Sequence, residues 1–195
     1  MQNFQYHSAR SLNEALRFLS ENGNQTKVIA GGTDLIPRLR GEDCHPGFVL
    51  NVLEIGLSGI KEENGRIRIG STTTHTQLVE SEILQGDCPA LVQAAGSIGG
   101  PLIRNRGTVG GNICNASPAA DLAPALLVLD AEAVLASEKA RRRVALKDFF
   151  LGPGKTALKP DELLAEISIP LPRGKNRFLK LGRRKAMTLS IVNAA

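Results

Sequence analysis

The stretch Thr108-Val109-Gly110-Gly111-Asn112-Ile113-Cys114-Asn115-Ala116-Ser117-Pro118-Ala119-Ala120-Asp121-Leu122-Ala123-Pro124 is the most informative part of this chain. A second double-glycine segment, Val28-Ile29-Ala30-Gly31-Gly32-Thr33-Asp34-Leu35, begins with a short apolar run. Paired glycines permit positive φ and carry no Cβ, so we interpret both segments as turns whose backbone N–H groups can close on a ligand. Either segment alone would be a plain turn. Together, with donors at Thr33, Thr108 and Asn112, they predict a site for the pyrophosphate of a dinucleotide.

Other sequence signatures of catalysis are absent. No Gly-x-Gly-x-x-Gly occurs, and Gly152-Pro153-Gly154-Lys155-Thr156 lacks the first glycine of a phosphate-binding P-loop, so we interpret it as a loop with an exposed lysine. The three cysteines, Cys44, Cys88 and Cys114, are too scattered to hold an iron–sulfur cluster or a structural zinc by themselves. We therefore expect no metal site, and we expect a bound cofactor to supply the chemistry.

Composition places the chain among ordinary globular proteins. It has 195 residues, of which 42% are hydrophobic and 22% charged, enough for one large domain or two small ones. No apolar run approaches the ~20 residues of a membrane span. The first residues lack the basic and apolar layout of a signal peptide. We expect a cytoplasmic protein without a membrane partner.

The net charge of +5 hides an asymmetry. Residues 1–138 carry 10 Lys or Arg against 15 Asp or Glu (net −5), whereas residues 139–195 carry 14 against 4 (net +10). The simpler interpretation is a solvated strand edge and loop, and the functional one is a face for an acidic partner subunit or an anionic ligand. With 6 Phe, 1 Tyr and no Trp, base stacking has little support, so no nucleic acid is expected.

Local patterns predict a mixture of helices and strands. Ser11 and Glu14 have the spacing of a capping box, and an apolar periodicity from Leu12 to Leu19 predicts a helix that ends at Gly23. Alternation and short apolar runs predict the remaining elements. The expected strands are 28–30, 48–52, 66–69, 133–136, 144–146, 163–169 and 178–183; the expected helices are 35–39, 76–82, 89–95 and 121–129.

Longer stretches of the sequence resemble a known family. Both double-glycine segments closely resemble the two flavin-binding segments of the molybdenum hydroxylases, in their FAD-binding medium subunit. Ser97-Ile98-Gly99-Gly100-Pro101-Leu102-Ile103-Arg104-Asn105 and Phe150-Leu151-Gly152-Pro153-Gly154-Lys155-Thr156 are most similar to the bacterial xanthine dehydrogenase branch. The resemblance implies an α+β fold, the two-lobed FAD-binding domain of the vanillyl-alcohol-oxidase (PCMH) type. Residues 1–57 would form an N-terminal α/β lobe, residues 58–175 a second α+β lobe, and residues 176–195 the start of a truncated C-terminal flavoprotein domain.

The resemblance also implies FAD as cofactor, lying between the lobes. By this resemblance the cofactor-binding residues would be Val28, Ile29, Ala30, Gly31, Gly32, Thr33, Asp34, Leu35, Ile98, Thr108, Val109, Gly110, Gly111, Asn112, Asp121, Leu164 and Lys180, with no catalytic residue among them. Taken alone, the residues favour core positions for Ile98 and Leu164, whereas Asp121 could equally be the N-cap of a helix.

The implied function is that of a subunit in a xanthine dehydrogenase-like hetero-oligomer. Electrons would pass from a molybdopterin-binding large subunit through an iron–sulfur small subunit to FAD, and then to NAD⁺ or another acceptor. The absence of cluster-binding cysteines fits this division of labour. Two alternatives stay open: a free-standing flavin oxidoreductase of the same fold, and a flavin-free basic binding module.

Overall fold

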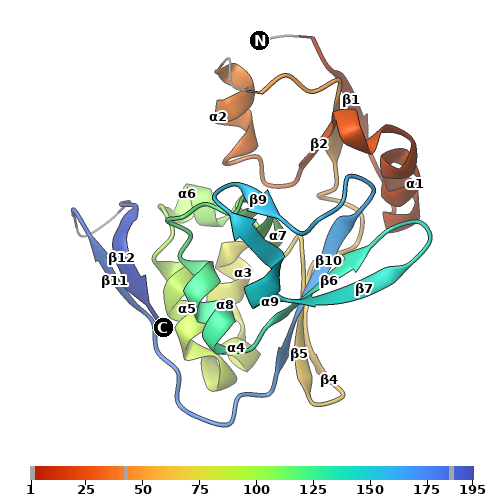
Figure 1. The fold of residues 1–195 in the computed structure, drawn as a ribbon. Helices are drawn as coiled ribbons and strands as arrows, with labels where there is room; N and C mark the ends of the chain where they lie inside the picture. Colours follow the sequence, from red (N-terminus) through yellow and green to blue (C-terminus); the bar gives the residue numbers. More distant parts are fainter. Residues whose placement is uncertain (1–2, 42–43, 185–186) are drawn as a thin grey trace.

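A three-stranded parallel sheet forms the N-terminal part of the protein, seen at the top of Figure 1. The structure, a computed structural model, describes residues 3–41, 44–184 and 187–195. The strand order is β1-β3-β2, with bounds Gln5–Ser8 for β1, Phe48–Asn51 for β3 and Thr26–Ile29 for β2. Val49 and Leu50 of the central strand are buried. This sheet with its two helices, α1 and α2, is called the parallel lobe below.

The first helix follows the predicted pattern. α1 spans Leu12–Asn22, and the Ser11 hydroxyl accepts a hydrogen bond from the Glu14 N–H at 3.2 Å. The Glu14 carboxylate accepts a hydrogen bond from the Arg10 N–H at 2.9 Å. In a capping box it would accept from the Ser11 N–H, one residue later. Ala15, Leu16 and Leu19 are buried, as the periodicity predicts. A 3₁₀ helix, η1 (Gly23–Gln25), leads into β2, and α2 (Leu35–Arg40) follows the first double-glycine segment.

The larger sheet has five antiparallel strands in the order β4-β5-β10-β6-β7. The bounds are Ile60–Glu63 (β4), Arg66–Gly70 (β5), Leu163–Pro170 (β10), Glu132–Ala136 (β6) and Arg141–Ala145 (β7). In β5 the residues alternate between faces: Ile67 and Ile69 are fully buried, while Arg68 pairs with Glu166 of β10 at 2.6 Å. This sheet, with α3 to α9, is called the antiparallel lobe.

Short helices cover one side of the antiparallel sheet (Figure 1). They are α3 (His75–Glu80), α4 (Glu82–Asp87), α5 (Pro89–Gly96), α6 (Pro101–Arg104), α7 (Val109–Asn115), α8 (Leu122–Val128) and α9 (Leu146–Phe149). Leu78, Leu91, Ile113 and Leu126 join Ile167 of β10 in one buried apolar core. Two hairpins complete the fold, β8 (Phe150–Gly152) with β9 (Lys155–Thr156), and β11 (Leu179–Gly182) with β12 (Ser190–Ala194).

An apolar cluster joins the two lobes. Leu16, Leu50 and Ile55 of the parallel lobe pack in one buried group with Leu163 and Ala165 of β10. This contact fixes the parallel lobe against the central strand of the antiparallel sheet. The division of the chain at residues 57 and 175 stays a prediction.

Several predicted elements differ from the structure. Gly110 and Gly111 lie in helix α7 with negative φ, so the interpretation of this segment as a turn is wrong. β1 and β4 were not predicted, because neither strand shows a clear apolar alternation. The helix expected over 76–82 is two helices that meet at Ser81, the N-cap of α4. β7 begins earlier than expected, and Leu146 starts α9 rather than ending the strand.

Within the described ranges, no helix combines the length and apolarity that a membrane span requires.

Candidate functional site

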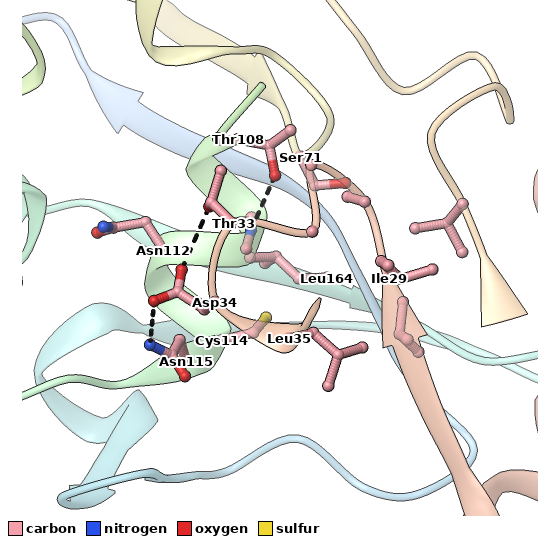
Figure 2. A pocket seen from close by; sticks show the side chains of 18 of the residues that line it. Ile29, Thr33, Asp34, Leu35, Ser71, Thr108, Asn112, Cys114, Asn115 and Leu164 are labelled. Atoms are coloured by element: carbon pink, nitrogen blue, oxygen red, sulfur yellow. Dashed lines mark hydrogen bonds between the residues drawn. The ribbon is translucent and has the colours of Figure 1, made fainter. Parts of the chain in front are cut away.

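A cavity of about 300 Å³ lies between the two lobes. Its walls come from the segment 27–35, from the polar run 71–75, from the first turns of α7, and from Leu163 and Leu164 of β10 (Figure 2). Such a volume, lined by both apolar side chains and backbone polar groups, is typical of a small-molecule site. The two double-glycine segments, 79 positions apart in the sequence, thus face one cavity.

The first double-glycine segment supplies free hydrogen-bond donors. Gly32 has φ +77°, which turns the chain into α2. A Cβ on Gly31 would lie 1.8 Å from the Arg106 carbonyl oxygen, so only glycine lets this loop approach the antiparallel lobe. Among the described residues, the backbone N–H groups of Thr33, Asp34 and Leu35 have no hydrogen-bond acceptor. Three such donors beside a helix start favour a phosphate or another anion.

The second double-glycine segment contributes in a different way. Three of its N–H groups are already bonded within the protein: Val109 donates to Thr73 O, Gly110 to Ser71 O at 2.8 Å, and Gly111 to Thr108 Oγ1 at 3.1 Å. A Cβ on Gly110 would lie 2.7 Å from Ser71 O, whereas a Cβ on Gly111 would meet only Thr108 Oγ1, at 3.1 Å. Gly110 therefore lets α7 pack closely against the backbone of Ser71. Gly111 is exposed and lines the cavity with backbone alone.

A polar run that was not predicted forms another wall. Ser71, Thr72 and His75 line the cavity and are buried. Thr72 Oγ1, His75 Nδ1 and Asn112 Oδ1 are buried without a hydrogen-bond partner among the described residues, and all three residues line the cavity. Unpartnered polar atoms typically cost about 1–3 kcal/mol each and cluster where a ligand is bound. The sequence signal was available, since four polar residues and a histidine directly follow β5.

Burial lowers the pKa of His75 to about 4, with a smaller contribution from the charge of Arg104. The folded protein favours the neutral imidazole. The His75 contribution to the free energy of unfolding is therefore fully present above pH 6.5 and is lost as the pH falls toward 4. The lowering corresponds to about 3 kcal/mol of unfolding free energy. We expect urea unfolding between pH 7 and pH 4 to show this loss, and His75→Gln to remove most of it.

Exposed His45 provides the matched control for this prediction. The His45→Gln variant should lose stability with falling pH as the parent protein does. A His75→Gln variant with the parental pH dependence would show that another group takes up the proton.

The Cys114 sulfur lies beside the cavity in Figure 2. Burial raises the pKa of this thiol to about 12, so it stays protonated and is a poor nucleophile at neutral pH. Within the described part of the chain, no three His, Cys, Asp or Glu side chains are grouped as a metal site would require.

The structure brings most of the predicted site residues together. Lining the cavity are Val28, Ile29, Ala30, Gly31, Gly32, Thr33, Asp34, Leu35, Thr108, Gly110, Gly111, Asn112 and Leu164. Four predicted residues lie outside this lining. Val109 is buried in the core, Ile98 packs against that core, and Asp121 pairs with Lys180.

Asp121 and Lys180 form a buried ion pair at 2.6 Å. Asp121 occupies the N-cap position of α8, but its side chain makes no cap bond. It accepts hydrogen bonds from Ser190 Oγ and Asn193 Nδ2, and Lys180 Nζ also donates to Ser97 O at 3.1 Å. These contacts hold the β11–β12 hairpin against the start of α8.

Comparisons with known proteins agree with this architecture. The family model described as "FAD binding domain in molybdopterin dehydrogenase" matches residues 2–172. The xanthine dehydrogenase FAD-binding subunit of Escherichia coli O157:H7 is 40% identical, covering 97% of this chain and 66% of that protein. The carbon monoxide dehydrogenase medium chain of Hydrogenophaga pseudoflava is 36% identical over 86% of this chain and 58% of its own length. The chain thus spans less than two thirds of these two relatives.

Solved structures show the same fold. A chain of carbon monoxide dehydrogenase from Hydrogenophaga pseudoflava superposes with a TM-score of 0.92 at 33% identity, over 97% of this chain and 67% of that one. Quinoline 2-oxidoreductase from Pseudomonas putida 86 gives 0.94 at 26% identity, over 98% and 67%. The predicted two-lobed α+β fold of the PCMH type is confirmed. With the family model covering most of its length, the chain belongs to the FAD-binding domains of molybdopterin dehydrogenases.

Proposed function

We propose that FAD binds in the cavity between the lobes and that the chain serves as the FAD-binding part of a xanthine dehydrogenase-like molybdenum hydroxylase. The observation that carries the proposal is the set of free N–H groups of Thr33, Asp34 and Leu35 at this cavity. They would hold the pyrophosphate, because phosphate oxygens only accept hydrogen bonds. Ala30 to Leu35 and Thr108 to Asn112 would enclose it from both sides.

The remaining walls fit the other parts of the cofactor. Ile29, Leu35 and Leu164 would pack against its apolar surfaces, and Gly111 leaves room for a close approach. Ile98, Val109, Asp121 and Lys180 stay in the proposed site through their positions in the family resemblance, although they lie outside the cavity lining. Bound FAD supplies electron and hydride transfer. The protein's own part is to bind the cofactor, orient it and exclude water.

The partners in this proposal are an iron–sulfur small subunit and a molybdopterin-binding large subunit. Support comes from the relatives, which are named as subunits or chains of dehydrogenases. The electron acceptor would be NAD⁺ or another carrier. A cytoplasmic location belongs to the same proposal, because Cys44, Cys88 and Cys114 are all free thiols.

The first test is a visible spectrum of the purified protein with the released cofactor identified by mass. We expect the bands of oxidised flavin and the mass of FAD in near-stoichiometric amount. A colourless protein that also fails to bind added FAD would contradict the proposal. Salt-dependent DNA binding without flavin would then favour the basic binding module.

The acceptor and the partners need a separate test. Anaerobic addition of NADH to the FAD-loaded protein should bleach the flavin if NAD⁺ is the acceptor. Copurification from the native host should bring down an iron–sulfur protein. Bleaching by neither NADH nor a reduced iron–sulfur protein would contradict the electron-transfer role while leaving FAD binding intact.

A further inference from the structure

One side-chain hydrogen bond joins the two lobes beside the cavity. Asn115 Nδ2, at the end of α7, donates to Asp34 Oδ1, just before α2, at 3.2 Å. Figure 2 shows the pair beside the cavity, with Thr33 next to it. Over residues 3–41, 44–184 and 187–195, no other side-chain hydrogen bond links the chain up to residue 57 with the chain after it. We propose that the Asp34–Asn115 pair is a latch that closes the cavity over its ligand and slows ligand release.

The location of the pair suits a latch better than a permanent support. The lobes are held together elsewhere by the buried apolar cluster of α1 and β3 against β6 and β10. Asp34 is exposed and Asn115 half-buried, so their bond can break without exposing the core. Opening the loop at this point would break one solvent-accessible hydrogen bond. The free-energy cost of losing it is small, so the loop can open often.

The loop that the latch holds carries the proposed phosphate donors. Asp34 lies between Thr33 and Leu35, whose N–H groups are free. With the bond formed, these three donors stay at a fixed distance from α7. Asn115 is therefore a positioning residue, which acts on the ligand through Asp34 rather than by touching it. This inference rests on the proposed function, in which FAD occupies the cavity.

The test measures FAD release from the loaded full chain, as the return of flavin fluorescence after dilution. Asn115→Leu removes the donor and should speed release about fivefold, with the binding rate unchanged within twofold. Asn115→Asp sets two carboxylates face to face and should speed release further. The double exchange Asp34→Asn with Asn115→Asp restores one donor and one acceptor, so release should be at least twofold slower than from Asn115→Asp alone. A merely structural role for Asn115 would not give this rescue.

Asn13→Asp is the matched control, because it adds the same charge at an exposed position of α1 in the parallel lobe. It should release FAD at the parental rate. Parental release from Asn115→Leu, or no rescue by the double exchange, would overturn the latch.

A second measurement separates failure of the latch from failure of the proposed function. If the parent protein never binds FAD, the proposed function fails, yet hydrogen exchange of the ligand-free protein still tests the latch. Asn115→Leu should raise exchange severalfold in the peptide 31–41, which carries Asp34 and α2. Unchanged exchange there would contradict the latch whatever the ligand.

Discussion

The Gly111→Val variant should fold normally and lose FAD binding by at least about 100-fold, the loss of roughly two tenfold steps in affinity. Gly111 is exposed toward the cavity in the first turn of α7, and an added Cβ would meet only Thr108 Oγ1, at 3.1 Å. The protein can therefore accept the valine, but the ligand cannot approach the helix. Flavin content and affinity, measured beside the melting temperature, check both halves of the prediction.

The control for this prediction is Cys114→Ser, three positions after Gly111 in α7, because it keeps nearly the same side-chain size at a cavity residue to which we give no ligand role. Its flavin content should equal that of the parent protein. A folded Gly111→Val protein with full FAD content would show that the cofactor does not pass this face of α7.

The Gly31→Ala variant should lose about 3 kcal/mol or more of unfolding free energy together with its flavin. A Cβ at this position would lie 1.8 Å from the Arg106 carbonyl oxygen and 3.1 Å from the Gly107 Cα. Both atoms belong to backbone, so relief requires moving the whole loop away from the antiparallel lobe. That movement would also displace the free N–H groups of residues 33–35. Urea unfolding and flavin content measure the two effects.

Gly86→Ala gives the matched control for the loss of a glycine. Gly86 is exposed in α4, and a Cβ there would meet nothing within 4 Å. Alanine favours helix over glycine by up to about 1 kcal/mol, so this variant should be as stable as the parent or slightly more so. Equal stability of Gly31→Ala and Gly86→Ala would show that the loop near Arg106 is not closely packed.

Helices and buried strands were predictable where local chemistry and packing agree. α1 begins at the expected Ser11 cap and buries its apolar positions, and β10 lies where the strand 163–169 was expected. β1 was missed because its exposed side chains carry no alternation, and its pairing with β3 is set by residues more than forty positions away. Tertiary pairing, not local preference, decides such a strand.

The site was predictable in its residues more than in its chemistry. Both double-glycine segments reach one cavity, but the N–H groups of residues 109–111 are bonded within the protein, whereas those of residues 33–35 are free. Glycine pairs fit a turn and a tightly packed helix start equally well, so the sequence could not distinguish them. Thr72 and His75 were missed for a similar reason: polar residues after a strand look like a surface loop in the sequence, whereas tertiary packing buries both.

The apolar cluster between the lobes also sets the order in which the protein can form as it is synthesised. Its N-terminal members, such as Leu16 and Leu50, must wait for Leu163 and Ala165, more than a hundred residues later. At about 5–20 residues per second, this wait lasts seconds, during which the inner face of the parallel sheet stays uncovered on the ribosome. Contacts so distant in sequence also slow folding itself. The cavity, which Leu163 and Leu164 help to line, therefore cannot be complete until β10 has been synthesised.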